Sequence, residues 1–131
     1  MNSILLVDDE TIICAEFART LEGLGFEVEV APTVESGLSR SEEAHFDAIL
    51  VEFNLTSEWG AHPRTGGGVR LIRDLRKSGK RIPILVYTAM EGETYQAASL
   101  DAGADDYILK RSPISDFFSR LREHIRMRGV T

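Results

Sequence analysis

The chain has very little cysteine, no long apolar run and no excess of basic residues. Cys14 is the only cysteine in 131 residues, so no disulfide can form within the chain, as is usual for proteins of a reducing cytoplasm. The longest apolar runs, Ile4–Val7 and Ile84–Val86, are far shorter than the roughly 20 residues that cross a membrane. The formal net charge of −6 disfavours nucleic acid as a partner, because binding to phosphates relies on clustered Lys and Arg. We therefore expect a cytoplasmic protein without a membrane span or a nucleic-acid site.

What the chain does contain is an apolar strand followed by an amphipathic helix, repeated five times. The length predicts a single domain over residues 1–131, with a folded core from about residue 3 to about residue 127. The expected strands are Ser3–Val7, Glu27–Ala31, Ala48–Glu52, Ile84–Tyr87 and Asp106–Leu109. The expected helices are Thr11–Leu24, Thr33–Ala44, Gly68–Lys77, Thr94–Ala102 and Pro113–Met127. This alternation predicts an α/β fold, with a doubly wound, five-stranded parallel sheet flanked by five helices.

The first helix shows the pattern on which such an assignment depends. Its apolar residues recur at the spacing of one helix face, and we expect that face to be buried: Ile13, Cys14, Phe17, Leu21 and Leu24. Cys14 is then an inert core residue.

Polar side chains gather at the predicted carboxyl ends of four strands, where open α/β sheets bind ligands. Asp8 and Asp9 follow the first strand, Glu52 ends the third, Thr88 follows the fourth and Lys110 follows the fifth. Each alone has an ordinary explanation, such as a helix cap, a turn or a solvated charge. Together they can bind a divalent cation through carboxylates and an anionic group through Lys and Thr.

In this order the residues resemble the bacterial response-regulator receiver domain, from Ile4 to about Arg126. The resemblance implies a flavodoxin-like (CheY-like) sheet with strand order 2-1-3-4-5. It also implies Mg²⁺ binding by Asp8 and Asp9, with the carboxylate at position 52 and the backbone carbonyl of Asn54.

The resemblance further assigns the switch that carries the state of the pocket to the surface. Thr88 matches the switch hydroxyl, Tyr107 the switch aromatic, and Lys110 the lysine that pairs with the phosphoacceptor. The implied interaction surface is built from the fourth helix, fifth strand and fifth helix.

The chain departs from the family pattern in three places. Glu52 stands where the family has the aspartate that accepts the phosphoryl group. Arg111 stands where a proline normally follows the lysine. The connection over residues 56–67, with Trp59, His62 and Arg64, is longer than usual and is either a lid or a partner contact.

Glu52 leaves two mechanisms open. In one, Glu52 reaches Lys110, and Thr88 as well, and holds an activated-like state; in the other, the pocket is vestigial and the domain is a fixed docking module. Both predict a non-enzymatic signalling domain that does not accept phosphate at the usual site. The alternatives are a receiver still phosphorylated on Glu52 and a small phosphatase or phosphotransferase. Weak Mg²⁺ binding is expected unless Glu52 fills the site and pairs with Lys110.

The expected partner is a protein that binds the 56–67 loop or the surface built from the fourth helix, fifth strand and fifth helix. A second copy of the chain is one candidate. The sequence identifies neither a histidine kinase nor the pathway, and it leaves open whether an output domain follows residue 131.

Overall fold

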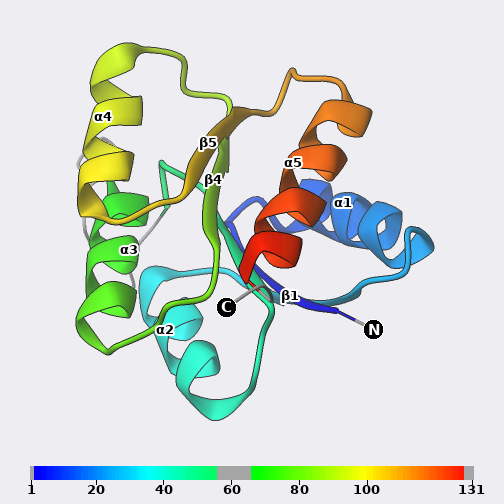
Figure 1. Ribbon diagram of the computed structural model, residues 1–131, viewed down its shortest axis with the longest axis horizontal. Helices are drawn as coiled ribbons and strands as arrows, with labels where there is room; N and C mark the ends of the chain where they lie inside the picture. The colour runs from blue at the N-terminus through cyan, green and yellow to red at the C-terminus, as the bar shows by residue number, and fades with distance from the viewer. Residues whose placement is uncertain (1, 56–65, 129–131) are drawn as a thin grey trace.

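A five-stranded parallel sheet forms the centre of the molecule, with strand order β2-β1-β3-β4-β5 (Figure 1). This computed structural model describes residues 2–55 and 66–128. The strands are β1 Ser3–Val7, β2 Glu27–Ala31, β3 Ala48–Val51, β4 Ile84–Thr88 and β5 Asp106–Leu109. The predicted fold class and strand order are confirmed.

Five helices cover the two faces of the sheet, and in Figure 1 α2, α3 and α4 lie on one side and α1 and α5 on the other. Their bounds are α1 Thr11–Gly23, α2 Val34–Glu43, α3 Gly67–Lys77, α4 Glu93–Ala102 and α5 Ile114–Arg128. Among the described residues, no helix is both long and apolar enough to cross a membrane.

Two apolar cores result because successive strand residues point to opposite faces. In β1, Leu5 and Val7 join the core under α2, α3 and α4, whereas Ile4 and Leu6 join the core under α1 and α5. In β5, Tyr107 belongs to the first core and Ile108 to the second. Burial on both faces explains the nearly continuous apolar runs of the inner strands.

The buried face of α1 is narrower than the sequence predicted. Cys14 and Leu21 are buried as expected, but Ile13 is 55% exposed and Leu24 is 38% exposed. Ala18, which the sequence pattern had not included, belongs to the buried face of α1. The prediction for Ile13 and Leu24 was wrong because α1 packs on the sheet through a stripe of its surface and not through the whole apolar arc.

Helix α3 begins in close contact with the chain that follows β3. A Cβ atom at Gly68 would lie 2.4 Å from the Glu52 carbonyl oxygen, and one at Gly67 would lie 2.0 Å from that of Leu55. The amide of Gly68 donates to the Phe53 carbonyl at 3.1 Å. These glycines therefore permit backbone-to-backbone packing. Trp59, His62 and Arg64, and with them most of the 56–67 loop, lie outside the described residues.

Candidate functional site

The predicted site residues do converge at the carboxyl end of the sheet. Glu52 follows β3, and its amide continues the strand ladder by donating to the Val7 carbonyl at 3.0 Å. Lys110 follows β5, and its amide donates to the Thr88 carbonyl at 2.8 Å. Backbone pairing of neighbouring strands thus places Asp8, Glu52, Thr88 and Lys110 at one edge of the sheet.

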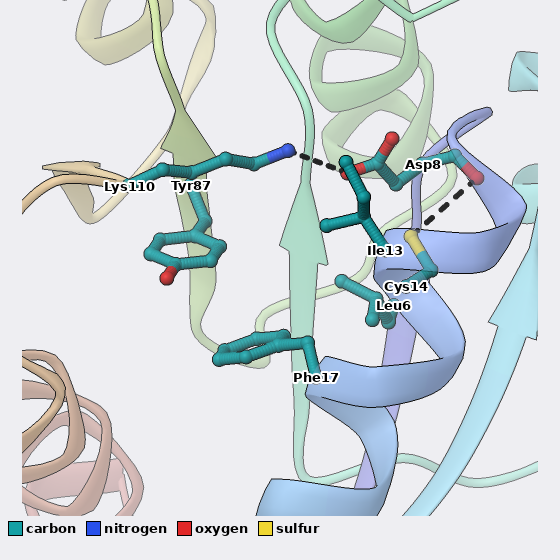
Figure 2. Close-up of a pocket in the computed structure, with 7 residues that line it drawn as sticks. All are labelled: Leu6, Asp8, Ile13, Cys14, Phe17, Tyr87 and Lys110. Carbon is teal, nitrogen blue, oxygen red and sulfur yellow. Dashed lines mark hydrogen bonds and ion pairs between the residues drawn. The ribbon is translucent and has the colours of Figure 1, made fainter.

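The centre of the site is a three-residue ion cluster. The Lys110 ammonium lies 2.9 Å from Asp8 Oδ2 and 3.1 Å from Glu52 Oε1. Figure 2 shows the lysine reaching across from the end of β5 to Asp8. The side chains of Asp8 and Glu52 are only 4% and 8% exposed, so water does little to screen these contacts.

The remaining oxygens of the two carboxylates are bound by backbone amides. Glu10 N–H donates to Asp8 Oδ1 at 3.0 Å, and Asn54 N–H donates to Glu52 Oε2 at 3.2 Å. All four carboxylate oxygens of Asp8 and Glu52 therefore have a partner within the chain. Such saturation is what makes burial of two carboxylates tolerable.

The electrostatics of Lys110 reflect the same contacts. Burial disfavours the charged ammonium, but the hydrogen bond to Asp8 and the charge of Glu52 outweigh burial and raise the pKa of Lys110. The lysine is therefore a permanent cation within the pocket.

A cavity of about 180 Å³ opens beside this cluster on the α1 side, as Figure 2 shows. Its lining residues are Leu6, Asp8, Ile13, Cys14, Phe17, Tyr87 and Lys110. The rings of Phe17 and Tyr87 stack with their centres 4.8 Å apart. Burial, followed by the charge of Asp8, raises the pKa of the Cys14 thiol to about 12. The thiol is therefore protonated at neutral pH, and a protonated thiol is a poor nucleophile.

The residues expected to hold Mg²⁺ do not fit a resident metal ion as they are placed. The Lys110 ammonium occupies the position between Asp8 and Glu52 where a cation would bridge them. Asp9 is half-buried, and within residues 2–55 and 66–128 no three metal-ligand side chains form a group that could hold a metal ion. The described contact of Asn54 with the site is made by its amide hydrogen. The contact between Glu52 and Lys110 is the condition under which the sequence predicts no weak Mg²⁺ binding.

The switch residues are joined through the backbone of Met90. The Thr88 hydroxyl, fully buried, accepts a hydrogen bond from Met90 N–H at 3.2 Å, and the Tyr107 hydroxyl donates to the Met90 carbonyl. Tyr107 is 7% exposed, so its ring is held inward. Burial, followed by the charge of Glu52, raises the pKa of Tyr107 to about 12. Among the described hydrogen bonds, none joins Glu52 to Thr88.

Sequence reasoning missed two contacts around the pocket. The ring of Phe53, next to Glu52, packs edge-to-face on Tyr95 of α4 with centres 5.2 Å apart. Arg111, which replaces the family's proline, forms an ion pair with Glu91. Met90 was also missed, because it takes part through its backbone and backbone groups leave no residue-type signal.

A profile of the response regulator receiver domain matches residues 4–122 of the chain. The KDP operon transcriptional regulatory protein KdpE of Escherichia coli K12 is 34% identical over 131 residues, which make up 100% of this chain and 54% of KdpE. The transcriptional regulatory protein PrrA of Mycobacterium tuberculosis is 30% identical over 128 residues, 98% of this chain and 52% of PrrA. The chain thus spans about half the length of these curated relatives.

Solved structures similar to this chain are also receiver domains. A CheY-like receiver domain protein from Methanospirillum hungatei JF-1 superposes with a TM-score of 0.85 at 28% identity, covering 98% of this chain and 97% of that one. The BeF3-activated N-terminal receiver domain of Klebsiella pneumoniae RstA gives 0.80 at 30% identity, with coverage of 95% and 99%. The chain belongs to the response regulator receiver domain family of two-component systems.

Proposed function

We propose that this domain is a signalling receiver that acts without phosphorylation at position 52, with its pocket held in an activated-like state by its own side chains. The observation that carries the proposal is the ion pair of Glu52 Oε1 with Lys110 at 3.1 Å, made by a carboxylate that is almost fully buried. A fixed negative charge thus sits on the pocket lysine without any phosphoryl group.

The chemistry of Glu52 argues against phosphoryl transfer to it. Glutamate carries its carboxylate roughly 1.5 Å further from the backbone than aspartate, the length of one C–C bond. A misplacement of about 1 Å can lower the rate of a transfer reaction about a hundredfold. Both oxygens of Glu52 are also engaged, one by Lys110 and one by the Asn54 amide. A carboxylate whose two oxygens are both engaged in this way is a poor in-line nucleophile.

The position of Tyr107 supports the activated-like state over a vestigial pocket. The receiver switch couples the hydroxyl at position 88 to the aromatic at position 107, and here both bind Met90. The inward ring leaves a depression of about 340 Å³ lined by residues of α4, β5 and α5. Leu100 and Ile114 are exposed on α4 and α5. We infer that the α4-β5-α5 face binds a protein partner, either a second copy of this domain or another component of its pathway.

Nucleic acid is not part of the proposal, because three of the four arginines of α5 have described partners within the chain. Arg120 pairs with Asp106, Arg126 pairs with Glu123, and the Arg122 guanidinium lies over the Phe118 ring at 4.1 Å. The curated relatives are named as transcriptional regulators and not as enzymes, and we propose a non-enzymatic role in the cytoplasm for this domain as well. No histidine kinase is required for it.

The test is phosphoryl uptake from acetyl phosphate in the presence of Mg²⁺, followed by intact-mass measurement. We expect no adduct on the wild-type protein. Glu52→Asp should gain one phosphoryl group, because Asp8, Asp9, Thr88 and Lys110 are unchanged and the shorter side chain restores the family's nucleophile. A wild-type adduct on Glu52 would contradict the proposal and favour a receiver that is still phosphorylated. Steady release of inorganic phosphate that is lost in Glu52→Gln would favour the enzyme.

A further inference from the structure

We propose that Lys110 serves as the built-in cation of this pocket, so that the wild-type domain does not respond to divalent metal ions, and that Asp8 and Glu52 form a latent divalent-cation site that becomes available only when the ammonium is removed. The inference rests on the proposed function in that it treats Glu52 as a permanent member of the pocket. It adds what neutralises the pocket in place of a metal.

The two carboxylate oxygens lie at hydrogen-bonding distance from the ammonium nitrogen, further away than the ligands of a metal ion. Asp8 Oδ2 and Glu52 Oε1 lie 2.9 and 3.1 Å from the Lys110 nitrogen. Mg²⁺ binds oxygen at about 2.0–2.1 Å and Ca²⁺ at about 2.3–2.6 Å. A metal ion could therefore enter only if the lysine left and the two carboxylates then moved together.

In the wild-type pocket no oxygen of the two carboxylates is left free for a metal ion. The second oxygen of each carboxylate already accepts a backbone amide, from Glu10 and from Asn54. Mg²⁺ usually keeps several of its waters when it binds to protein. Asp8 and Lys110 both line the cavity of about 180 Å³, which leaves space for those waters once the ammonium is removed.

Packing holds the lysine in this position. Its ammonium lies 5.9 Å from the centre of the Tyr87 ring, and that ring is stacked on Phe17 and in contact with Phe117. A cation tethered to the end of β5 competes with dissolved Mg²⁺ as an intramolecular ligand, so its effective concentration at the carboxylates is high. Tethering and ring packing together explain why a dissolved ion does not displace it.

Removal of the ammonium makes the binding of a divalent ion favourable. Two buried carboxylates that share one cation would then face each other without a counter-ion, which is unfavourable for both. A divalent ion supplies the missing charge. The gain in affinity should be about a hundredfold or more, the scale set by the attraction between unit charges about 4 Å apart in a partly buried site.

The experiment compares Mn²⁺ binding by calorimetry, and the shift of the thermal midpoint with MgCl₂, at constant ionic strength and without any phosphodonor. The variants are Lys110→Met, Lys110→Arg and the double variant Lys110→Met with Glu52→Gln. Lys77→Met, on the exposed end of α3, is the matched control. We expect binding and a rise of the midpoint in Lys110→Met alone. The wild type, Lys110→Arg, the double variant and Lys77→Met should show neither.

Mn²⁺ binding by the wild type would overturn the inference, and so would a folded Lys110→Met that binds no Mn²⁺. If Lys110→Met does not fold, the wild type and Lys110→Arg still decide, because Mn²⁺ binding by either contradicts a lysine that excludes the metal. Phosphoryl uptake is measured separately by mass. A wild type that binds Mn²⁺ but takes up no phosphoryl group would therefore reject this inference and leave the proposed function standing.

Discussion

At the scale of single residues, burial and the charge of Glu52 set the chemistry of the Tyr107 hydroxyl. The pKa of Tyr107 is raised from 10.0 to about 12 in the folded protein. The folded chain therefore keeps this proton at pH values at which the unfolded chain has lost it. The resulting stabilisation is present in full below pH 10 and is lost as the pH rises towards the folded-state value of about 12.

Tyr107→Phe isolates this contribution. At neutral pH the variant should be less stable by about 1 kcal/mol, because the hydrogen bond to the Met90 carbonyl is lost. The difference in free energy of unfolding between wild type and variant should shrink as the pH rises above 10. In that range the unfolded wild type loses the Tyr107 proton and is stabilised, whereas the variant has no such proton to lose. Urea denaturation across this range measures this difference. A difference that does not change with pH would contradict the assignment.

At the scale of elements, the start of α3 is fixed by how closely its backbone approaches the Glu52–Leu55 segment. Gly68→Ala should destabilise the protein by about 2 kcal/mol or more, because the new methyl group would meet the Glu52 carbonyl, 2.4 Å away. Gly23→Ala, in the last turn of α1, is the matched control because it has nothing within 4 Å. It should be neutral or stabilising. Equal effects on the unfolding midpoint would mean that α3 adjusts its position freely.

Helix α5 is fastened to β5 through Asp106, which accepts hydrogen bonds from Arg120 Nε at 3.1 Å and from His124 at 2.9 Å. Burial opposes the charge of Asp106, but these donors outweigh it and lower its pKa. This contribution is present above the ordinary carboxyl pKa and is lost as the pH falls below it.

Arg120→Met should lower the free energy of unfolding at neutral pH by about 1 kcal/mol, a moderate value because His124 remains and Arg120 is partly exposed. The control is Arg126→Met on the same helix. It breaks an ion pair with Glu123 that lies in solvent, so little change is expected. If the two variants unfolded at the same urea concentration, Asp106 would not be an anchor of α5.

The strands and the strand-end residues could be predicted from the sequence because each leaves a residue-type signal. Apolar runs mark Ile4–Val7 and Ile84–Val86, and acids or a lysine follow the strands directly. Contacts made by the backbone leave no such signal. Three features are therefore visible only in the three-dimensional structure: the hydrogen bond from Tyr107 to Met90, the close approach of Gly68 to Glu52, and the exposure of Ile13. Gly67 and Gly68, the first two residues of α3, serve this backbone packing.

At the scale of the whole molecule, two routes lead from the pocket to the α4-β5-α5 face, one ending at Tyr107 of β5 and the other at Tyr95 of α4. One runs from Thr88 through Met90 to Tyr107, and the other runs from Glu52 through its neighbour Phe53 to Tyr95. Both end on the α4-β5-α5 face. A change of charge at position 52 therefore has packed contacts through which to reach the proposed partner surface.

Whether Glu52 holds the pocket in an activated-like state is tested most directly by comparing the wild type with Glu52→Ala. Sedimentation gives the solution size of both proteins with and without acetyl phosphate and Mg²⁺. Binding to any partner that the wild type retains is measured on the same two proteins. We expect the phosphodonor to leave the solution size of the wild type unchanged. Glu52→Ala should lose the association or partner binding of the wild type, because Lys110 loses its contact with position 52 and the charge that acts on Tyr107 is removed. Identical behaviour of the two proteins, or a wild type that changes only with acetyl phosphate, would contradict these expectations.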